Sequence, residues 1–241
     1  MTAGDETLTP PRRGLLSRLP FANHLFPGAA ITRAQVDPYA ARWAAANERD
    51  QELQGPLWVV LGDSTGQGIG ASRHDRGYVG QFRDMLNRDT DTAWRVLNLS
   101  RSGDRAEDVV HNQLPQLARL KETPQLVTCI VGANDLLRTP LRRLQELFHS
   151  IATALPEGAV VGTIPQGIRA GRAQEVNRLI ATYAAENRLV VADIWSASGP
   201  PWFGKFAEDH FHPNDAGYAL WAQAIARAVE LPREADWSGP R

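Results

Sequence analysis

Short apolar runs alternate with longer segments of helical periodicity from residue 57 to residue 230. The runs have the mostly hydrophobic composition of strands buried on both faces, and they are 57–61, 95–99, 126–131, 159–164 and 189–194. The segments between them repeat apolar residues every three or four positions and predict helices over 78–87, 106–120, 141–155 and 172–187. Pro115 is expected to interrupt the second helix, and a last helix is expected over 215–230, before Pro232.

This alternation predicts an α/β fold. Strands that are separated by helices pair in parallel through right-handed crossovers, so we expect a three-layer α/β/α sandwich around a five-stranded parallel sheet. The sequence contains no internal repeat, and no further apolar runs remain that could form a second sheet. We therefore expect one domain over residues 56–232, followed by a tail over 233–241.

The first 55 residues are expected to form an arm and a helix that pack on this domain. Residues 1–13 are rich in Pro, Arg and Thr and are expected to be disordered, whereas 14–35 are expected to be extended. Apolar residues recur at helical spacing between residues 36 and 53, with Asp37-Pro38 as the expected helix start.

Composition narrows the classes of function and location. The 241 residues carry 26 Lys and Arg against 27 Asp and Glu, and a formal net charge of −1 excludes a generally basic nucleic-acid-binding protein. The one cysteine, Cys129, lies inside an apolar run, which excludes an intrachain disulfide and an all-cysteine metal site and favours a buried apolar role. The N-terminus lacks the apolar core of a signal peptide, and no run of about 20 apolar residues occurs, so we expect a cytoplasmic protein without a transmembrane segment.

Residues with catalytic chemistry follow three of the predicted strands. Ser64 lies in a glycine-rich turn after the first strand, Gly103 follows the second, and Asn134 follows the third. The segment Asp209–Pro213 precedes the last helix. Ligands of open parallel sheets bind beyond the carboxyl ends of the strands, so these residues are expected to share one edge.

Together these residues can perform nucleophilic catalysis. A sharp turn can present the Ser64 hydroxyl, His212 can accept its proton, and Asp209 can reach the other imidazole nitrogen. Pro213 keeps His212 out of helical geometry, so the acid and the histidine are expected in a loop. The Gly103 N–H and the Asn134 amide can stabilise an oxyanion, at roughly 3–4 kcal/mol for each donor.

Four ordered blocks carry a resemblance to a known family, and they are Gly62-Asp63-Ser64, Gly103, Gly132-x-Asn134-Asp135 and Asp209-x-x-His212-Pro213. Over residues 57–231 the chain resembles the SGNH hydrolase superfamily, also called GDSL esterases and lipases, whose fold is flavodoxin-like. The resemblance implies a carboxylic ester hydrolase with Ser64 as nucleophile and with Asp209 and His212 completing a catalytic triad. It implies an oxyanion hole made by Ser64, Gly103 and Asn134. The chain departs from the family at Thr65, where Leu or Ile is frequent, and in the Arg101 and Arg105 side chains that flank Gly103.

Other interpretations of the same residues are weaker. Gly62-x-Ser64-x-Gly66 also fits the nucleophile elbow of the α/β-hydrolase fold, but there several strands precede the elbow. The glycines over 66–70 lack the spacing of a nucleotide-binding loop. A metal site would have to use Asp209, His210, His212 and Asp215. That site would leave Ser64 without a purpose, so we expect neither a metal nor a cofactor.

The substrate is expected to be a small-molecule ester, with a small or short-to-medium acyl group, because the segments between strands are short and show no extended lid. Two alternatives remain open at this point: an acyltransferase that passes the acyl group to a sugar or lipid alcohol, and a catalytically silent binding module. The oligomeric state is not indicated. The side chains expected to line the substrate pocket are Leu136, Trp202, Phe206 and Phe211.

Overall fold

The computed structural model describes residues 27–230 except 168 and 187, and it contains a single five-stranded sheet within that part of the chain. The strand order is β2-β1-β3-β4-β5, and every neighbouring pair is parallel. The strands are β1 (Leu57–Gly62), β2 (Arg95–Asn98), β3 (Leu126–Ile130), β4 (Ala159–Gly162) and β5 (Leu189–Ala192). The predicted α/β fold with a five-stranded parallel sheet is therefore confirmed.

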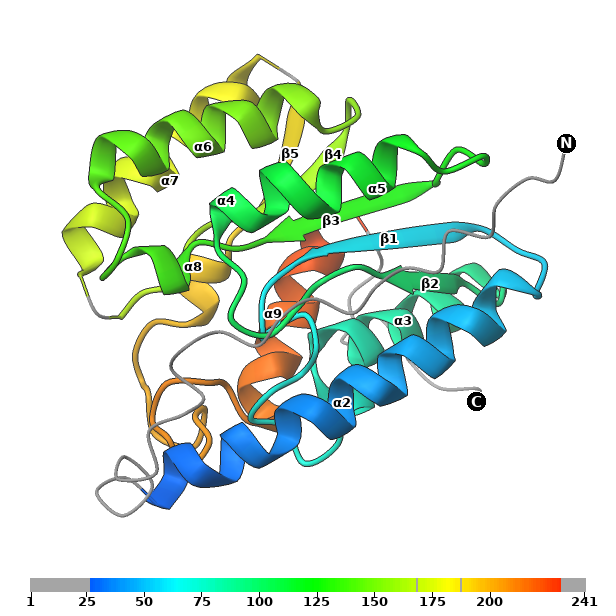
Figure 1. Ribbon diagram of the computed structural model, residues 1–241, viewed down its shortest axis with the longest axis horizontal. Coiled ribbons are helices and arrows are strands. Elements are labelled where there is room, and N and C mark those ends of the chain that lie inside the picture. Colours follow the sequence, from blue (N-terminus) through cyan, green and yellow to red (C-terminus); the bar gives the residue numbers. More distant parts are fainter. Residues whose placement is uncertain (1–26, 168, 187, 231–241) are drawn as a thin grey trace, which may run out of the picture.

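Helices cover both faces of this sheet, which makes the three-layer sandwich (Figure 1). One face carries α4 (Ala106–Asp108), α5 (Leu114–Ala118), α6 (Leu141–Ala154) and α7 (Ala170–Ala185). The other carries α2 (Pro27–Gln51), α3 (Tyr78–Thr90) and α9 (Asp215–Ala228). Val59 and Leu61 of β1 pack in the first apolar layer and Trp58 and Val60 in the second, so alternate side chains of one strand are buried on opposite faces.

Four strands end earlier than predicted, because the chain turns away at the edge where the polar residues lie. The runs expected to end at 99, 131, 164 and 194 leave the sheet after Asn98, Ile130, Gly162 and Ala192. Asp193 then caps the short helix α8 (Ile194–Ala197) by accepting a hydrogen bond from the Ser196 N–H. Expected helix bounds differ from the observed ones by at most three residues, except in the two segments described next.

The helix expected over 106–120 is divided, although the division does not begin at Pro115. A π-helical turn over Val109–Gln113 separates α4 from α5, and Pro115 lies in the first turn of α5. A proline ring in a regular α-helix would clash with the carbonyl four residues earlier, and the wider turn relieves this clash. Buried Cys129 packs in the sheet as predicted, and burial raises the pKa of its thiol to about 12.

The prediction for residues 27–35 was wrong, because they belong to α2 and are not extended. This helix runs through Pro38, the expected start. Tertiary contacts outweigh the cost of the proline, since α2 covers the free edge of β2. Asn47 pairs through its side-chain amide with both the N–H (2.8 Å) and the carbonyl (2.9 Å) of Asn98. Asp50 accepts the Val96 N–H at 3.0 Å, so side chains of α2 take the place of a sixth strand.

The expectations for residues 1–13, 14–26 and 233–241 lie outside the described residues. Among the helices of the described part, none is long and apolar enough to span a bilayer.

Candidate active site

Ser64 lies in a tight turn directly after β1. Gly62 ends the strand with φ +152°, and a Cβ there would approach the Ile130 carbonyl to 2.3 Å. Asp63 closes the turn by accepting hydrogen bonds from the Thr65 N–H (2.9 Å) and the Thr65 hydroxyl (2.8 Å). Thr65, where the family often has an aliphatic residue, thus supplies two hydrogen-bond donors to the carboxyl group of Asp63. This group is buried, and its burial raises its pKa. In this turn Ser64 is 6% exposed.

The structure brings Ser64, His212 and Asp209 into one line of hydrogen bonds. Ser64 Oγ lies 3.0 Å from His212 Nε2, and His212 Nδ1 lies 2.6 Å from Asp209 Oδ2. The other carboxylate oxygen of Asp209 accepts the backbone N–H groups of Phe211 (3.0 Å) and His212 (2.9 Å). Both oxygens are therefore committed, and this fixes the carboxylate relative to the imidazole ring.

The electrostatics of Asp209 favour its ionised form. Burial raises the pKa of this carboxyl group, but the hydrogen bond and charge of His212, with the two backbone N–H groups, lower it more. The net result is a pKa well below the ordinary value for aspartate. Asp209 therefore stays negatively charged at neutral pH, where it can stabilise a protonated imidazole.

Backbone and side-chain donors lie at the ends of β2 and β3. Gly103 adopts φ +89°, and within the described residues no group accepts its N–H or that of Ser64. Asn134 lies in the short helical turn Ala133–Asp135 and donates through Nδ2 to the Asp104 carbonyl at 2.9 Å. One amide hydrogen of Asn134 is thereby used, which leaves the second as a donor.

Asp135 holds the turn that carries Asn134. Its carboxylate accepts the Ala106 N–H (2.9 Å) and the Thr139 hydroxyl (2.6 Å), and it is completely buried. Arg172 adds to this support by donating through Nη1 to the Leu136 carbonyl at 2.6 Å. The residues that follow β3 are therefore tied to α4 and to α7.

The four side chains predicted to line the substrate pocket occupy different surroundings. Leu136 is 5% exposed in the apolar core, whereas Trp202 and Phe211 are exposed. The Phe211 ring packs edge-on against the His212 ring, with their centroids 5.0 Å apart. Phe206 lines a cavity of about 470 Å³ between α2 and residues 206–216. Of the four, Phe211 has a described ring contact with the Ser64–His212–Asp209 line.

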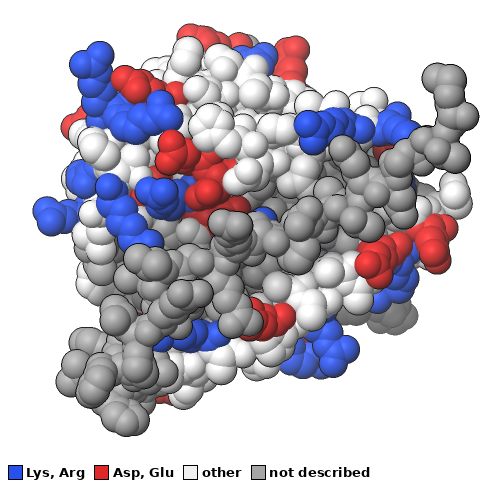
Figure 2. Space-filling model, in the orientation of Figure 1, with Lys and Arg blue, Asp and Glu red and all other residues white. Residues whose placement is uncertain are grey.

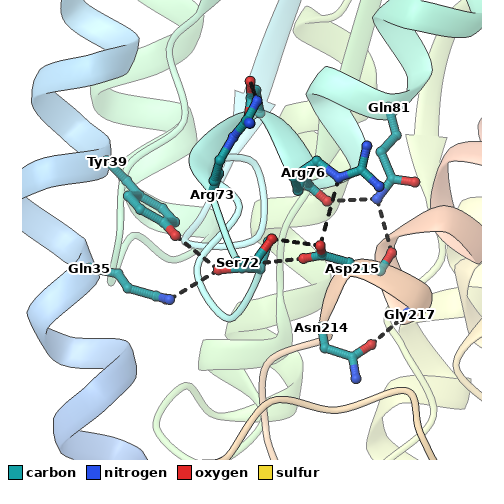
Figure 3. Close-up of polar contacts among 11 residues, drawn as sticks. Gln35, Tyr39, Ser72, Arg73, Arg76, Gln81, Asn214, Asp215 and Gly217 are labelled. Carbon is teal, nitrogen blue, oxygen red and sulfur yellow. Dashed lines mark hydrogen bonds and ion pairs between the residues drawn. The ribbon is translucent and has the colours of Figure 1, made fainter.

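A network of hydrogen bonds that the sequence did not predict links α2, residues 70–72 and the start of α9 (Figure 3). Gln35 of α2 accepts the Gly70 N–H at 2.8 Å and donates to the Ala71 carbonyl at 3.0 Å, and Tyr39 donates to the same carbonyl at 2.9 Å. Ser72 in turn donates through its N–H (2.7 Å) and hydroxyl (2.6 Å) to Asp215 at the start of α9. Asp215, which could have been a metal ligand, is committed to this network.

Within the described part of the chain, no cluster of three or more His, Cys, Asp or Glu side chains is placed to hold a metal ion.

Gly70 is the point at which this network contacts the histidine. It adopts φ +96°, and a Cβ there would lie 2.7 Å from His212 Cβ and 2.5 Å from the Pro213 carbonyl oxygen. A Gly70→Ala change is therefore expected to displace His212 and to lower kcat by about 100-fold, the effect of misplacing a catalytic group by about 1 Å. Steady-state kinetics with a soluble ester measure this effect.

Gly158→Ala is the matched control for this change. Gly158 also has a positive φ (+77°), but a Cβ there meets nothing within 4 Å. Both variants carry the backbone strain of an alanine in this region, about 1–3 kcal/mol, and should lose similar thermal stability from it. Equal kcat values for the two variants would show that contact with His212 does not matter.

A parallel α/β/α sandwich that presents a hydrogen-bonded serine, histidine and aspartate beside free N–H donors is the architecture of a hydrolase. The sequence profile of the GDSL-like lipase/acylhydrolase family matches residues 60–220. The chain belongs to this family, as the four sequence blocks predicted, and it is a carboxylic ester hydrolase.

Solved structures share this fold at low sequence identity. A lipase, Lip_vut3 from a goat rumen metagenome, is 16% identical and has a TM-score of 0.61, covering 72% of this chain and 97% of the other. Axe2, an acetylxylan esterase from Geobacillus stearothermophilus, is 20% identical with a TM-score of 0.58, over 75% and 98% of the two chains. TesA is 22% identical with a TM-score of 0.60, over 72% and 98%. No curated protein sequence matches the chain.

Proposed function

We propose that the protein is a serine esterase that cleaves esters through an acyl-enzyme on Ser64. The observation that carries this proposal is the line of hydrogen bonds from Ser64 Oγ to His212 Nε2 (3.0 Å) and from His212 Nδ1 to Asp209 Oδ2 (2.6 Å). A serine hydroxyl is a weak nucleophile until a base is positioned to take its proton. Here the base is in place, and the acid that orients it is held by two backbone N–H groups.

The proposed reaction has two halves. Ser64 Oγ attacks the ester carbonyl carbon while its proton passes to His212 Nε2, and the carbonyl oxygen becomes an oxyanion. Collapse of this intermediate breaks the bond to the alcohol, which leaves with the proton from His212. Water then attacks the acyl carbon while His212 takes its proton, and collapse of this second intermediate breaks the bond to Ser64 Oγ. His212 returns the proton to Ser64 Oγ, and the acid is released. Throughout, Asp209 keeps Nδ1 protonated and stabilises the imidazolium.

The oxyanion is proposed to be bound by the N–H groups of Ser64 and Gly103 and by the second amide hydrogen of Asn134. An Asn134→Ala change is expected to lower kcat by about 10² to 10³-fold, since the lost donor acts on charge that develops in the transition state. KM should change little. Asn112→Ala, at an exposed position of the π-helical turn, is the control and should keep wild-type kcat. A wild-type kcat for the Asn134 variant would remove this residue from the oxyanion hole.

The substrate is proposed to be a small-molecule ester with a small or short-to-medium acyl group. Lysine, arginine and acidic side chains are interspersed over the face shown in Figure 2, in keeping with a net charge of −1 and a neutral substrate. Residues 56–232 are proposed to be the catalytic unit, with α2 packed against it. A panel of p-nitrophenyl esters from acetyl to palmitoyl would test the acyl range, and the highest kcat/KM on the longest chains would contradict this proposal.

Reaction with a fluorophosphonate tests the nucleophile itself. Ser64 Oγ should attack phosphorus and expel fluoride, which adds one phosphonyl group that mass spectrometry locates on Ser64. The Ser64→Ala variant is the control and should remain unmodified. Folded wild-type protein that stays unmodified would favour a silent binding module.

Product analysis with added sugar or lipid alcohols separates hydrolysis from acyl transfer in the second half-reaction. Transfer of the acyl group to the alcohol in preference to water would identify an acyltransferase.

A further inference from the structure

Gln113 is a buried polar side chain that the proposed reaction does not use. It ends the π-helical turn Val109–Gln113 and is 0% exposed. Its Nε2 donates to the Gly62 carbonyl and to Asp104 Oδ2, both at 2.8 Å, while its Oε1 accepts the Gly62 N–H at 2.8 Å. Both amide hydrogens and one lone pair are thus satisfied by two segments that are far apart in the sequence.

The two partners of Gln113 adjoin the two halves of the site. Gly62 ends β1 two residues before Ser64, so its peptide sets the position of the nucleophile turn. Asp104 follows Gly103, and the Asp104 carbonyl accepts the hydrogen bond from Asn134 Nδ2 at 2.9 Å. A continuous set of hydrogen bonds therefore runs from the strand that carries Ser64, through Gln113 and Asp104, to the donors proposed for the oxyanion.

We propose that Gln113 and Asp104 are positioning residues, which fix the oxyanion donors of Gly103 and Asn134 relative to Ser64. This inference rests on the proposed acyl-enzyme mechanism. An oxyanion hole is effective only if its donors are held in place before the charge develops. Gly103 has no side chain that packing could hold, and a Cβ there would meet nothing within 4 Å, so its position depends on the turn that Asp104 closes by donating its N–H to the Arg101 carbonyl at 3.1 Å.

The chemistry of Asp104 explains why an amide donor is needed opposite it. The pKa of this carboxyl group is raised to about 6, mainly by burial and also by the nearby charges of Asp108 and Asp63, while the Gln113 hydrogen bond and Arg101 oppose the rise. At neutral pH the group is a partly buried carboxylate, and a hydrogen bond to a charged acceptor is stronger than one between neutral groups. π-Helical turns are frequent at functional sites, and here the turn places the side-chain amide of Gln113 against the Asp104 carboxylate.

Two substitutions of Asp104 test the linkage without disturbing the bonds between Gln113 and Gly62. D104A removes the acceptor and is expected to lower kcat by about 10- to 100-fold with KM unchanged, because misplaced donors act on the transition state. D104N keeps a carbonyl oxygen for Gln113 and should retain most of the wild-type kcat. A purely structural role would lower thermal stability in both variants without this split between kcat and KM.

Gln113 itself is tested by reversing the polarity of the bond. Q113E places a second carboxylate against Asp104 and also removes the donor to the Gly62 carbonyl, so it should lose activity. The double variant D104N/Q113E restores the donor–acceptor pair between positions 104 and 113 but not the bond to the Gly62 carbonyl, and it should recover only part of the lost kcat. Q116E is the matched control, because Gln116 makes a solvent-exposed hydrogen bond to the Asn112 carbonyl of the preceding turn and contacts neither Gly62 nor Asp104 through a hydrogen bond. If Q113E does not fold, the kcat and KM values of D104A and D104N still test the positioning role.

The inference is overturned if D104A has the kcat of the wild type, or if its defect lies in KM alone. Labelling of the wild-type protein by the fluorophosphonate separates this failure from failure of the proposed mechanism. A wild-type protein labelled on Ser64, together with an unimpaired D104A variant, would leave the mechanism intact and remove the positioning role.

Discussion

Replacement of Ser64 by alanine is expected to lower kcat by roughly four to six orders of magnitude, the loss seen when the nucleophile of a serine triad is removed. The fold should persist, because the turn is held by groups other than the hydroxyl. Ile69 N–H donates to the Ser64 carbonyl at 3.1 Å, and Asp63 binds Thr65. The hydroxyl itself bonds to His212, whose hydrogen bond to Asp209 remains in the variant. Turnover of p-nitrophenyl acetate and thermal unfolding measure the two effects.

Ser150→Ala is the control for this prediction. Its hydroxyl lies in the second half of α6, the part that leads back toward the amino end of β4, and donates to the Glu146 carbonyl of the preceding turn. The variant should keep wild-type kcat. Substantial residual turnover by the Ser64 variant would mean that another group attacks the ester, and the acyl-enzyme proposal would fail.

The Asp209→Asn variant is expected to lose about 10⁴-fold in kcat, because the wrong imidazole tautomer is stabilised. If the new amide nitrogen faces His212, it requires an acceptor at Nδ1, so the proton moves to Nε2 and the base is lost. If the amide is flipped, its nitrogen faces the N–H groups of Phe211 and His212 that Asp209 Oδ1 now accepts at 3.0 and 2.9 Å. Neither orientation satisfies both sides. Single-turnover kinetics with a p-nitrophenyl ester measure the acylation step directly.

The stability of this variant should depend on pH. The pKa of Asp209 is lowered on folding, so its carboxylate stabilises the native state above the unfolded-state pKa of about 3.9, and this contribution is lost as the pH falls through the folded-state value. The stability gap between the wild type and the asparagine variant should therefore be widest near neutral pH and should narrow below about pH 4.

Asp193→Asn is the control for the change at Asp209. Asp193 accepts the Ser196 N–H as the cap of α8, and asparagine is an equally good cap. This variant should keep wild-type activity and stability. A kcat for the Asp209 variant within tenfold of wild type would show that the hydrogen bond to His212 is not used in the reaction.

Parallel strand topology explains why the sequence located the central residues of the site. The predicted strands ended just before Ser64, Gly103 and Asn134, and parallel strands bring their carboxyl ends to one edge of a sheet. Asp209 and His212 were found because they lie three positions apart in a loop that Pro213 keeps non-helical. Each of these inferences used only the local sequence and the rule that parallel strands bring their carboxyl ends to one edge of the sheet. None of them required knowledge of how the side chains pack.

Residues that act through packing left no comparable signal. Gln113 has the sequence setting of an ordinary helical glutamine, and its role depends on the π-helical turn and on Gly62 and Asp104. Gln35 and Gly70 likewise become important only in the folded chain, where Gln35 of α2 binds Gly70 and Gly70 lies against His212. The start of α2 was misplaced because Pro38 is a local helix breaker, whereas contacts of α2 with the edge of β2 stabilise the longer helix.

The sequence by itself determined the layered α/β fold, the family and the expected triad, because hydrophobic periodicity and short polar blocks are local properties of the chain. Tertiary structure alone decided how closely His212 approaches Ser64, which side chains of α2 cover the edge of the sheet, and how Gln113 holds the end of β1. These depend on hydrogen-bond partners separated by tens of residues, and burial makes such partners obligatory only once the chain has packed.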